Sequence, residues 1–447
     1  MPKPIIINST IKKYNKKIKV DGDKSLSIRF ALLASQAIGK SKGYNLLKSE
    51  DVISTINCLK KLGVKIKWDK KNNFCIINGN GLNSYIYKDN LTLNGNNSGT
   101  CVRLLTSLLI NSSKKIKIIG DKSLSKRDMK RIIEPLTEFG ATFYPKNKKT
   151  LPLHIKGSNF LTPINYLELK GSSQCKSSVM LAALLAPGET KLICKPSRNH
   201  TELLFKYLKI PIKIKKNKNF EIIKVKGKQN FKSFNYNIPS DISSSAFFIV
   251  LTLLSKDSKL ILKKVGVNKS RTGIIDILNK MGAKINFKNK KNYKGEMVAD
   301  IHVKSAKYLK SINCPPKLNA SAIDEFLIIF LAAAKAKGVS YFSNLEELNK
   351  KESRRLDWGS KILSMMGVKN KLVKNHGIKI WGQPNLKLNN KYEVKNYLKD
   401  HRVMAMSTIA ALTFGGKWKI HNPETIKTSF PSFFKILKKD LGSKINL

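Results

Sequence analysis

The most regular feature of the chain is a polar or charged cluster followed directly by an apolar run. Residues 24–27 precede the apolar run 30–34, and residues 323–325 precede the apolar run 326–334. A run of this kind predicts a helix that is buried on all sides rather than an amphipathic surface helix. Behind each run the pattern predicts a strand, then an amphipathic helix that ends at a glycine such as Gly63, and then a further strand.

This plan occurs six times, at roughly 70 to 80 residues per copy. The copies span residues 24–66, 97–141, 172–210, 241–285, 323–368 and 400–445. The period is longer than that of a solenoid repeat, so each copy should be a whole α/β unit. Because the 447 residues exceed what one core supports, about 250 to 300, we expect two domains with three copies each.

The expected domain boundaries follow from where the copies begin. The third and fourth copies meet in a polar stretch that ends in Pro239 and Ser240, which is typical of a crossover between domains. The first copy begins only after Asp21 and Gly22, so the first residues should supply a strand to the second domain. The predicted domains are residues 21–237, and residues 1–20 together with 238–447.

The repeated plan also indicates where ligands bind. A helix N-terminus exposes unpaired N–H groups and carries a partial positive charge. Here each apolar helix begins with hydroxyl, amide or charged side chains, so several such ends facing one cleft would bind anions.

The composition is that of a folded protein, with 41% apolar residues. The formal charge is +56, from 85 Lys and Arg against 29 Asp and Glu, and such a surplus raises the possibility of a nucleic-acid partner. The lysines are spread along the whole chain, however, and short clusters such as residues 288–291 fall between the periodic segments. We therefore favour a solvated basic surface that arises from biased composition, and we expect no specific nucleic-acid partner; polyanion binding stays open as the alternative.

The cysteines and the apolar runs exclude other classes. The six cysteines form neither close pairs nor a metal-ligand spacing, which argues against a disulfide framework or a zinc site. No apolar core typical of a signal peptide is present near the N-terminus, and the longest apolar runs are far too short to cross a bilayer. We expect a cytoplasmic protein without a membrane role, a metal or another cofactor, and most simply a monomer.

Each polar cluster has a structural and a chemical interpretation. Lys24, Ser25 and Arg29 suit a phosphate or carboxylate, but they equally fit an N-cap beside solvated cations. The clusters around Gly99 and Ser172 are similar helix starts. The charged clusters 351–355 and 400–402 would also fit surface salt bridges. Asp324 would also fit a helix cap. Recurrence of such clusters at corresponding places in all six copies favours function.

These motifs resemble the family of 5-enolpyruvylshikimate-3-phosphate (EPSP) synthases, also called 3-phosphoshikimate 1-carboxyvinyltransferases, over nearly the full length of the chain. The matching stretches follow in the family's order: 23–29, 95–103, 120–127, 171–178, 197–202, 241–246, 268–273, 323–325, 347–356, 400–406 and 429–431. The resemblance implies two α/β domains, each of three βαβαββ units in an inside-out α/β barrel, with the active site in the interdomain cleft. It also implies transfer of the enolpyruvyl group of phosphoenolpyruvate to the 5-hydroxyl of shikimate 3-phosphate, with no cofactor.

The resemblance further implies roles for individual residues. The residues implied for phosphoenolpyruvate binding are Lys24, Asn97, Gly99, Arg127, Gln174, Arg355, Arg402 and Lys427. Those implied for shikimate 3-phosphate binding are Lys24, Ser25, Arg29, Ser172, Ser173, Gln174, Ser197, Asp324 and Lys351. Asp324 would accept the proton of the attacking hydroxyl, Glu352 would protonate the donor methylene, and Lys24 would act beside them; two carboxylates in unlike environments are suited to such paired proton transfers.

The chain departs from the family pattern at several positions within these motifs. Asn349 and Arg354 replace the usual Arg and Asp of the Lys-Glu-Ser motif, Leu104 and Asp128 replace frequent prolines, and Lys427 is displaced by one residue from the family's C-terminal lysine. The nearest alternative is the related transferase that acts on UDP-N-acetylglucosamine, which the Ser-Ser-Gln, Lys-Glu-Ser and Asp-His-Arg motifs disfavour. From another class, a basic nucleic-acid-binding scaffold without turnover would predict tight, salt-sensitive binding of RNA or DNA.

Overall fold

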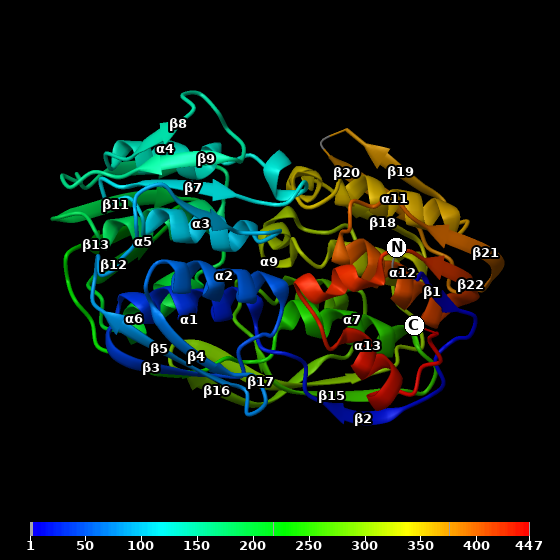
Figure 1. The fold of residues 1–447 in the computed structure, drawn as a ribbon. Coiled ribbons are helices and arrows are strands. Elements are labelled where there is room, and N and C mark those ends of the chain that lie inside the picture. Colours follow the sequence, from blue (N-terminus) through cyan, green and yellow to red (C-terminus); the bar gives the residue numbers. More distant parts are fainter. Residues whose placement is uncertain (1–2, 218, 375, 447) are drawn as a thin grey trace. The chain divides into compact units, whose positions relative to one another are not determined.

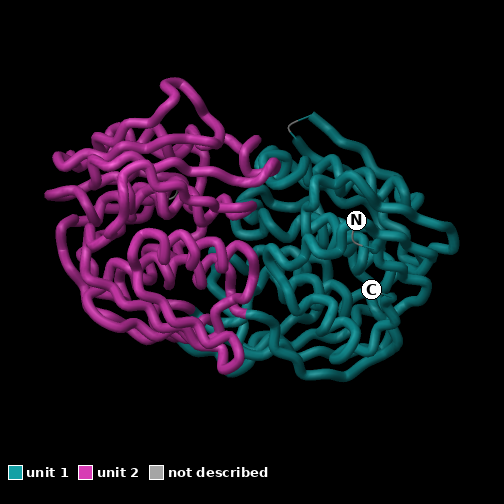
Figure 2. Tube along the Cα trace, viewed as in Figure 1, with its two compact units in different colours: residues 1–21, 239–292, 297–447 teal, residues 22–238, 293–296 magenta. Residues whose placement is uncertain are grey.

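The computed structural model describes residues 3–217, 219–374 and 376–446. The chain forms two compact units (Figure 2). Unit 1 comprises residues 1–21, 239–292 and 297–447, and unit 2 comprises residues 22–238 and 293–296. Each unit is built from mixed α/β sheets, and none of the sheets in the described part of the chain closes into a barrel.

Unit 2 contains three four-stranded sheets, in the orders β14-β3-β5-β4, β6-β7-β9-β8 and β10-β11-β13-β12. In each sheet the first two strands are parallel and the others antiparallel, as a βαβαββ unit requires. The strands are β3 (Ile38–Tyr44), β4 (Lys65–Asp69), β5 (Phe74–Asn80), β6 (Leu91–Asn94), β7 (Lys115–Ile119), β8 (Thr142–Tyr144), β9 (Leu153–Lys156), β10 (Asn165–Glu168), β11 (Glu189–Cys194), β12 (Ile212–Lys216), β13 (Glu221–Lys226) and β14 (Asn235–Asn237).

The helices of unit 2 connect these strands. Three of them, α1, α3 and α5, start the repeat copies and are buried over most of their length; α1 packs on β5 and α5 on β11 (Figure 1). Their apolar sides form the core of the unit. The helices are α1 (Lys24–Gln36), α2 (Glu50–Lys61), α3 (Gly99–Ser107), α4 (Lys130–Glu138), α5 (Ser173–Ala183) and α6 (His200–Tyr207), with a short 3-10 helix η1 (Leu124–Lys126).

Unit 1 also contains three sheets, and the N-terminal segment supplies strands to two of them. Its sheets have the orders β16-β17-β15-β2, β18-β20-β19 and β1-β22-β21. From the N-terminal segment, β2 pairs in parallel with β15, and β1 pairs antiparallel with β22. The strands are β1 (Ile5–Ile7), β2 (Asn15–Ile18), β15 (Lys259–Gly266), β16 (Asn286–Tyr293), β17 (Glu296–Lys304), β18 (Val339–Phe342), β19 (Asn370–Val373), β20 (Gly377–Trp381), β21 (Leu388–Val394) and β22 (Gly415–Ile420).

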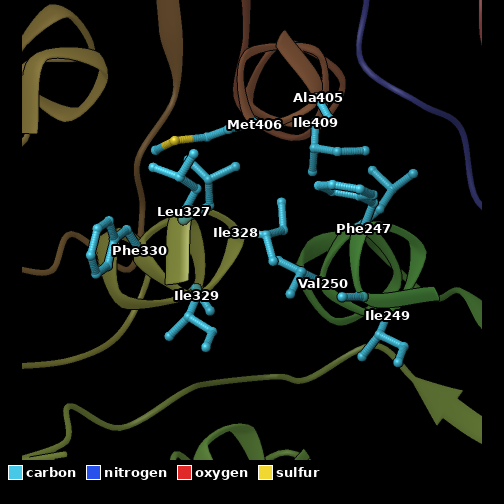
Figure 3. Packing of buried hydrophobic residues seen from close by; sticks show 14 of the residues in the cluster. Phe247, Ile249, Val250, Leu327, Ile328, Ile329, Phe330, Ala405, Met406 and Ile409 are labelled. Atoms are coloured by element: carbon cyan, nitrogen blue, oxygen red, sulfur yellow. The ribbon is translucent and has the colours of Figure 1, made fainter. Parts of the chain in front are cut away.

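The core of unit 1 is centred on three mutually packed helices, α7, α10 and α12. Figure 3 shows Phe247, Ile328 and Ile409, one from each helix, pointing toward one another. All side chains of α7 and α10 are buried. The α10 sequence is apolar throughout, and α7 is apolar apart from the serines at 243–245 and Thr252. The helices are α7 (Ile242–Leu254), α8 (Gly273–Lys280), α9 (Asn319–Ala322), α10 (Phe326–Ala334), α11 (Arg355–Met365), α12 (His401–Phe414) and α13 (Phe433–Lys435), with η2 (Pro316–Leu318), η3 (Glu346–Lys350), η4 (Pro423–Thr428) and the π-helix η5 (Ile436–Asp440).

Side-chain caps fix where most of these central helices begin. In unit 2, Asp23 accepts a hydrogen bond from the Leu26 N–H at 2.8 Å, and Ser98 and Ser172 cap α3 and α5 in the same way. In unit 1, Asp241 and Asp400 cap α7 and α12. Each cap satisfies an N–H group that the helix itself leaves unpaired.

The tip of the β16–β17 hairpin, residues 293–296, belongs to unit 2. There the buried Glu296 carboxylate bonds to His200 Nδ1, and the Tyr293 hydroxyl accepts a hydrogen bond from the Asn237 N–H at 2.9 Å. The repeat pattern did not predict this tip. None of the helices in the described part of the chain is long and apolar enough to span a membrane.

Candidate active site

The candidate residues of unit 2 lie at the first turns of the central helices. Lys24 opens α1, and its ammonium is 2.9 Å from the carboxylate of Asp51 on α2. The Lys24 side chain keeps 21% of its surface exposed, so the cation is fixed by a carboxylate and still reaches solvent. Ser25 is half-buried beside it, and its carbonyl accepts a hydrogen bond from Arg29 at 3.2 Å.

Two arginines converge on the start of α3. Arg127 donates to the Asn97 side-chain carbonyl at 2.8 Å, while the Asn97 amide donates to Asp121 at 2.6 Å. A Cβ atom at Gly99 would lie 3.2 Å from Nη1 of both Arg127 and Arg103. Glycine at this position therefore allows two guanidinium groups to approach the helix N-terminus, which is a favourable arrangement for an anion.

Gln174 is held at both ends of its amide. Its oxygen accepts from Arg103 at 2.6 Å, and its nitrogen donates to the Thr100 hydroxyl at 3.0 Å. These partners fix the orientation of the amide. Gln174 and Ser173 form the partly exposed first turn of α5, next to the cap residue Ser172.

Ser172 and Ser197 differ in how their hydroxyls are used. The Ser172 hydroxyl caps α5 and also accepts from Arg131 at 3.3 Å. The Ser197 hydroxyl is shielded from solvent and has no hydrogen-bond partner among the described residues. Arg29 lies in the interior, where it donates to the hydroxyls of Thr201 and Ser177 at 2.9 and 2.8 Å.

The candidate residues of unit 1 gather around one buried guanidinium. Arg355 is 2% exposed and contacts three carboxylates. Its Nε is 2.8 Å from Asp400, its Nη1 is 3.5 Å from Asp324, and its Nη2 bonds to Glu352. The Asp324 and Glu352 side chains keep 16% and 17% of their surface exposed. One fixed cation thus positions two carboxylates that still reach solvent.

Burial and charge set the protonation of this cluster. Burial by itself would raise the pKa of Asp400, but the Arg355 charge outweighs it and the pKa is lowered, so Asp400 is ionised. Burial also lowers the pKa of the adjacent His401, with help from the Arg402 charge, to about 3. His401 is therefore neutral at physiological pH, and its Nε2 has no partner in the described part of the chain.

The other cations of unit 1 lie at different distances from the acids. Lys351 is 3.4 Å from the Asp324 carboxylate, and Arg402 donates to the Asp324 carbonyl at 2.6 Å. Lys427 is exposed on η4, and no ion pair among the described residues links it to the cluster. The structure thus brings together every unit 1 candidate except Lys427.

The substituted motif positions are accommodated within the motif itself. Asn349 accepts from the Leu356 N–H and donates to Asp357, both at 2.9 Å, so it caps the start of α11. Arg354 is exposed and pairs with Asp357 at 2.5 Å. Neither substitution displaces Arg355 from the acids.

The sequence patterns missed several partners of these residues. Asp51 and Asp121 fix Lys24 and Asn97, although each lies 24 or more positions away along the chain. A second buried cluster joins Glu325 and Arg271 through the Ser243 hydroxyl. No local spacing signals such pairs, because the partners come from different elements.

No group of three or more His, Cys, Asp or Glu side chains in the described residues is arranged to hold a metal ion.

The chain has clear relatives among known proteins. The model of the family described as EPSP synthase (3-phosphoshikimate 1-carboxyvinyltransferase) matches residues 9–437. A relative named 3-phosphoshikimate 1-carboxyvinyltransferase from Ruthia magnifica subsp. Calyptogena magnifica is 39% identical over 435 residues, which are 96% of either chain. A second relative with the same name, from Petrotoga mobilis, is 37% identical over 95% of this chain and 96% of the relative.

Two solved structures share the fold of this chain over its whole length. EPSP synthase from Acinetobacter baumannii matches 100% of this chain and 99% of its own with a TM-score of 0.85 and 34% identity. The enolpyruvyl transferase NikO from Streptomyces tendae matches 100% of this chain and 99% of its own with a TM-score of 0.78, at 15% identity, so it supports the fold alone.

Proposed function

Because the chain belongs to the EPSP synthase (3-phosphoshikimate 1-carboxyvinyltransferase) family, we propose that it transfers the enolpyruvyl group of phosphoenolpyruvate to the 5-hydroxyl of shikimate 3-phosphate and releases phosphate. This step belongs to the shikimate pathway, which leads to chorismate and the aromatic amino acids. The observation that carries the proposal is the contact of Arg355 with both Asp324 and Glu352. The addition step removes one proton from the hydroxyl of the acceptor and delivers one proton to the donor. Asp324 and Glu352 are the two acids proposed for these transfers.

Four cations are proposed to hold the donor. Lys24, Arg127, Arg355 and Arg402 supply positive charge for its phosphate and carboxylate, and charge-assisted hydrogen bonds of this kind are stronger than neutral ones. Asn97 and Gly99 shape the surface beside Arg127, and the fixed amide of Gln174 adds a directional contact. Lys427 is exposed, so we give it only an outer role in phosphoenolpyruvate binding.

The acceptor would be held by hydroxyls together with three cations, one amide and one carboxylate. Ser172, Ser173 and Ser197 are suited to the 3-phosphate, because hydroxyls donate to its oxygens and the α5 N-terminus favours an anion. The remaining proposed contacts to shikimate 3-phosphate come from Lys24, Ser25, Arg29, Gln174, Asp324 and Lys351.

The chemistry divides between the two acids. Asp324 takes the proton of the 5-hydroxyl of shikimate 3-phosphate while the hydroxyl oxygen forms a bond to C2 of phosphoenolpyruvate. Glu352 delivers a proton to C3, the methylene carbon of phosphoenolpyruvate. The resulting tetrahedral intermediate loses phosphate as C3 returns a proton and the double bond forms again. The cations stabilise the charge that develops on the departing phosphate. Protons and electrons balance in this sequence of steps without any cofactor.

We also propose that the protein is a monomer and that it is located in the cytoplasm.

A direct assay tests the proposal. Purified protein should release phosphate from phosphoenolpyruvate in the presence of shikimate 3-phosphate and not in the presence of UDP-N-acetylglucosamine. Glu352→Gln should nearly abolish turnover while shikimate 3-phosphate still binds. Turnover with the nucleotide sugar alone, or near-normal turnover of Glu352→Gln, would contradict the acceptor or the acid role respectively.

A further inference from the structure

Lys176 is a fully buried cation in unit 2, two residues after Gln174 on α5. Its ammonium is 2.6 Å from Glu202 on α6 and 3.2 Å from Glu221 on β13. Lys216, at the end of β12, contacts the other Glu221 oxygen at 3.1 Å. Two ammonium groups and two carboxylates make the cluster neutral, as burial of charge requires.

Burial by itself would lower the pKa of Lys176. The charges of Glu202 and Glu221 outweigh that effect, and the net shift of the pKa is upward. Lys176 therefore stays charged and keeps three N–H donors.

The third contact of the ammonium serves a different purpose. Lys176 donates to the main-chain carbonyl of Ser197 at 3.3 Å, a bond that charge balance does not require. Ser197 lies in the connection between β11 and α6, while Lys176 is on the helix that carries Ser172, Ser173 and Gln174. The bond holds the Ser197 carbonyl, while the shielded Ser197 hydroxyl has no hydrogen-bond partner among the described residues.

The neighbouring helix has other anchors. Thr201 on α6 is held by Arg29 at 2.9 Å and by Ser177 at 2.8 Å, and His200 is bonded to Glu296. These bonds do not depend on Lys176. Loss of Lys176 should therefore release Ser197 locally rather than detach α6.

We propose that Lys176 is a positioning residue, which fixes Ser197 relative to Ser172 and Ser173 so that their hydroxyls meet the 3-phosphate of the acceptor together. The inference rests on the proposed function, because it assigns that phosphate to this part of unit 2. It extends the site from side chains at the surface to a buried cation behind them.

The test separates positioning from stability. Lys176→Met alone leaves Glu202 buried without its partner and risks misfolding. The double variant Lys176→Met/Glu202→Gln keeps the cluster neutral, through Lys216 and Glu221, but still lacks the bond to Ser197. Its KM for shikimate 3-phosphate should rise roughly tenfold or more, while KM for phosphoenolpyruvate changes much less. Lys216→Met, the same substitution at the exposed end of the cluster, should leave both KM values unchanged.

A double-mutant cycle with Ser197→Ala gives the decisive readout. In the wild-type background, Ser197→Ala should raise KM for shikimate 3-phosphate; in the Lys176→Met/Glu202→Gln background it should add little, because Ser197 is already misplaced. A full additive effect, or a wild-type KM in a double variant of normal Tm, would overturn the positioning role. Failure of the wild-type protein to turn over or bind shikimate 3-phosphate would instead overturn the proposed function itself.

Discussion

Replacing Arg355 tests the account of the unit 1 cluster most severely. In Arg355→Met the side-chain volume is largely kept, but the buried Asp400 carboxylate, which has no exposed surface, loses its cation. Removing one partner of a buried ion pair destabilises a protein by about 3–5 kcal/mol. Asp400 would keep its hydrogen bonds from Ser353 and from the Arg402 N–H, both at 2.9 Å. We therefore expect a loss near the lower end, about 3 kcal/mol.

The dependence of this loss on pH has a definite sign. In the wild type the pKa of Asp400 is lowered, so the pair stabilises the fold above the unfolded pKa of about 3.9 and the contribution disappears as pH falls through the folded pKa. In the variant, burial without a cation would raise the pKa of Asp400, and protonation at falling pH would relieve the unpaired charge. The difference in stability between the two proteins should therefore shrink from about pH 7 to about pH 4.5.

Urea unfolding followed by tryptophan fluorescence measures the effect, because Trp358, Trp381 and Trp418 all lie in unit 1. Arg354→Met is the matched control. Its guanidinium is 72% exposed and pairs with Asp357 at the surface, so its removal should destabilise by less than about 1 kcal/mol. Equal losses in the two variants, or a loss at Arg355 that grows as pH falls, would refute the reasoning.

Three further predictions concern other parts of the chain. His401→Gln should make stability fall less as pH falls. The pKa of His401 is about 3 in the folded protein and about 6.5 in the unfolded chain, so the wild type loses stability as pH drops below about 6.5. Equal shifts of the urea midpoint between pH 7 and pH 5 in both proteins would be evidence against a buried neutral imidazole. Lys213→Glu should raise Tm, and Tm should then increase less with added NaCl than it does in the wild type. Lys191, Lys224 and Lys213 lie directly opposite one another on three neighbouring strands, and like charges opposite each other destabilise by roughly 0.2–1 kcal/mol. A lower Tm would contradict this. Lys24→Ala should lower kcat/KM for phosphoenolpyruvate at least roughly tenfold, and unchanged donor kinetics in steady-state assays would reject its assignment.

The central helices and their polar first turns were predictable from the sequence. An all-apolar run such as residues 326–334 has no surface to present to water, so it predicts a buried helix. Its N-terminus must then emerge from the core, and the polar residues before the run mark that position. This reasoning works because it uses neighbouring residues only.

Partners from separate elements were not predictable in the same way. In the sequence, Asp400 belongs to a cluster that fits a surface salt bridge. The structure shows that it is buried, that it caps α12 and that it holds Arg355, which is 45 positions away. Likewise nothing in the alternation of β16 and β17 indicates that the turn between them belongs to unit 2. Such contacts depend on how several repeat copies pack, which no single copy specifies.

Mass spectrometry of the reaction in deuterium oxide tests the central claim most directly. If Glu352 protonates C3 and the methyl group of the intermediate then returns a proton, the enolpyruvyl product must carry deuterium in its methylene group, and Glu352→Gln must lose product and label together. Product that forms from shikimate 3-phosphate and phosphoenolpyruvate without deuterium in the methylene would contradict the addition and elimination that these two acids are proposed to perform.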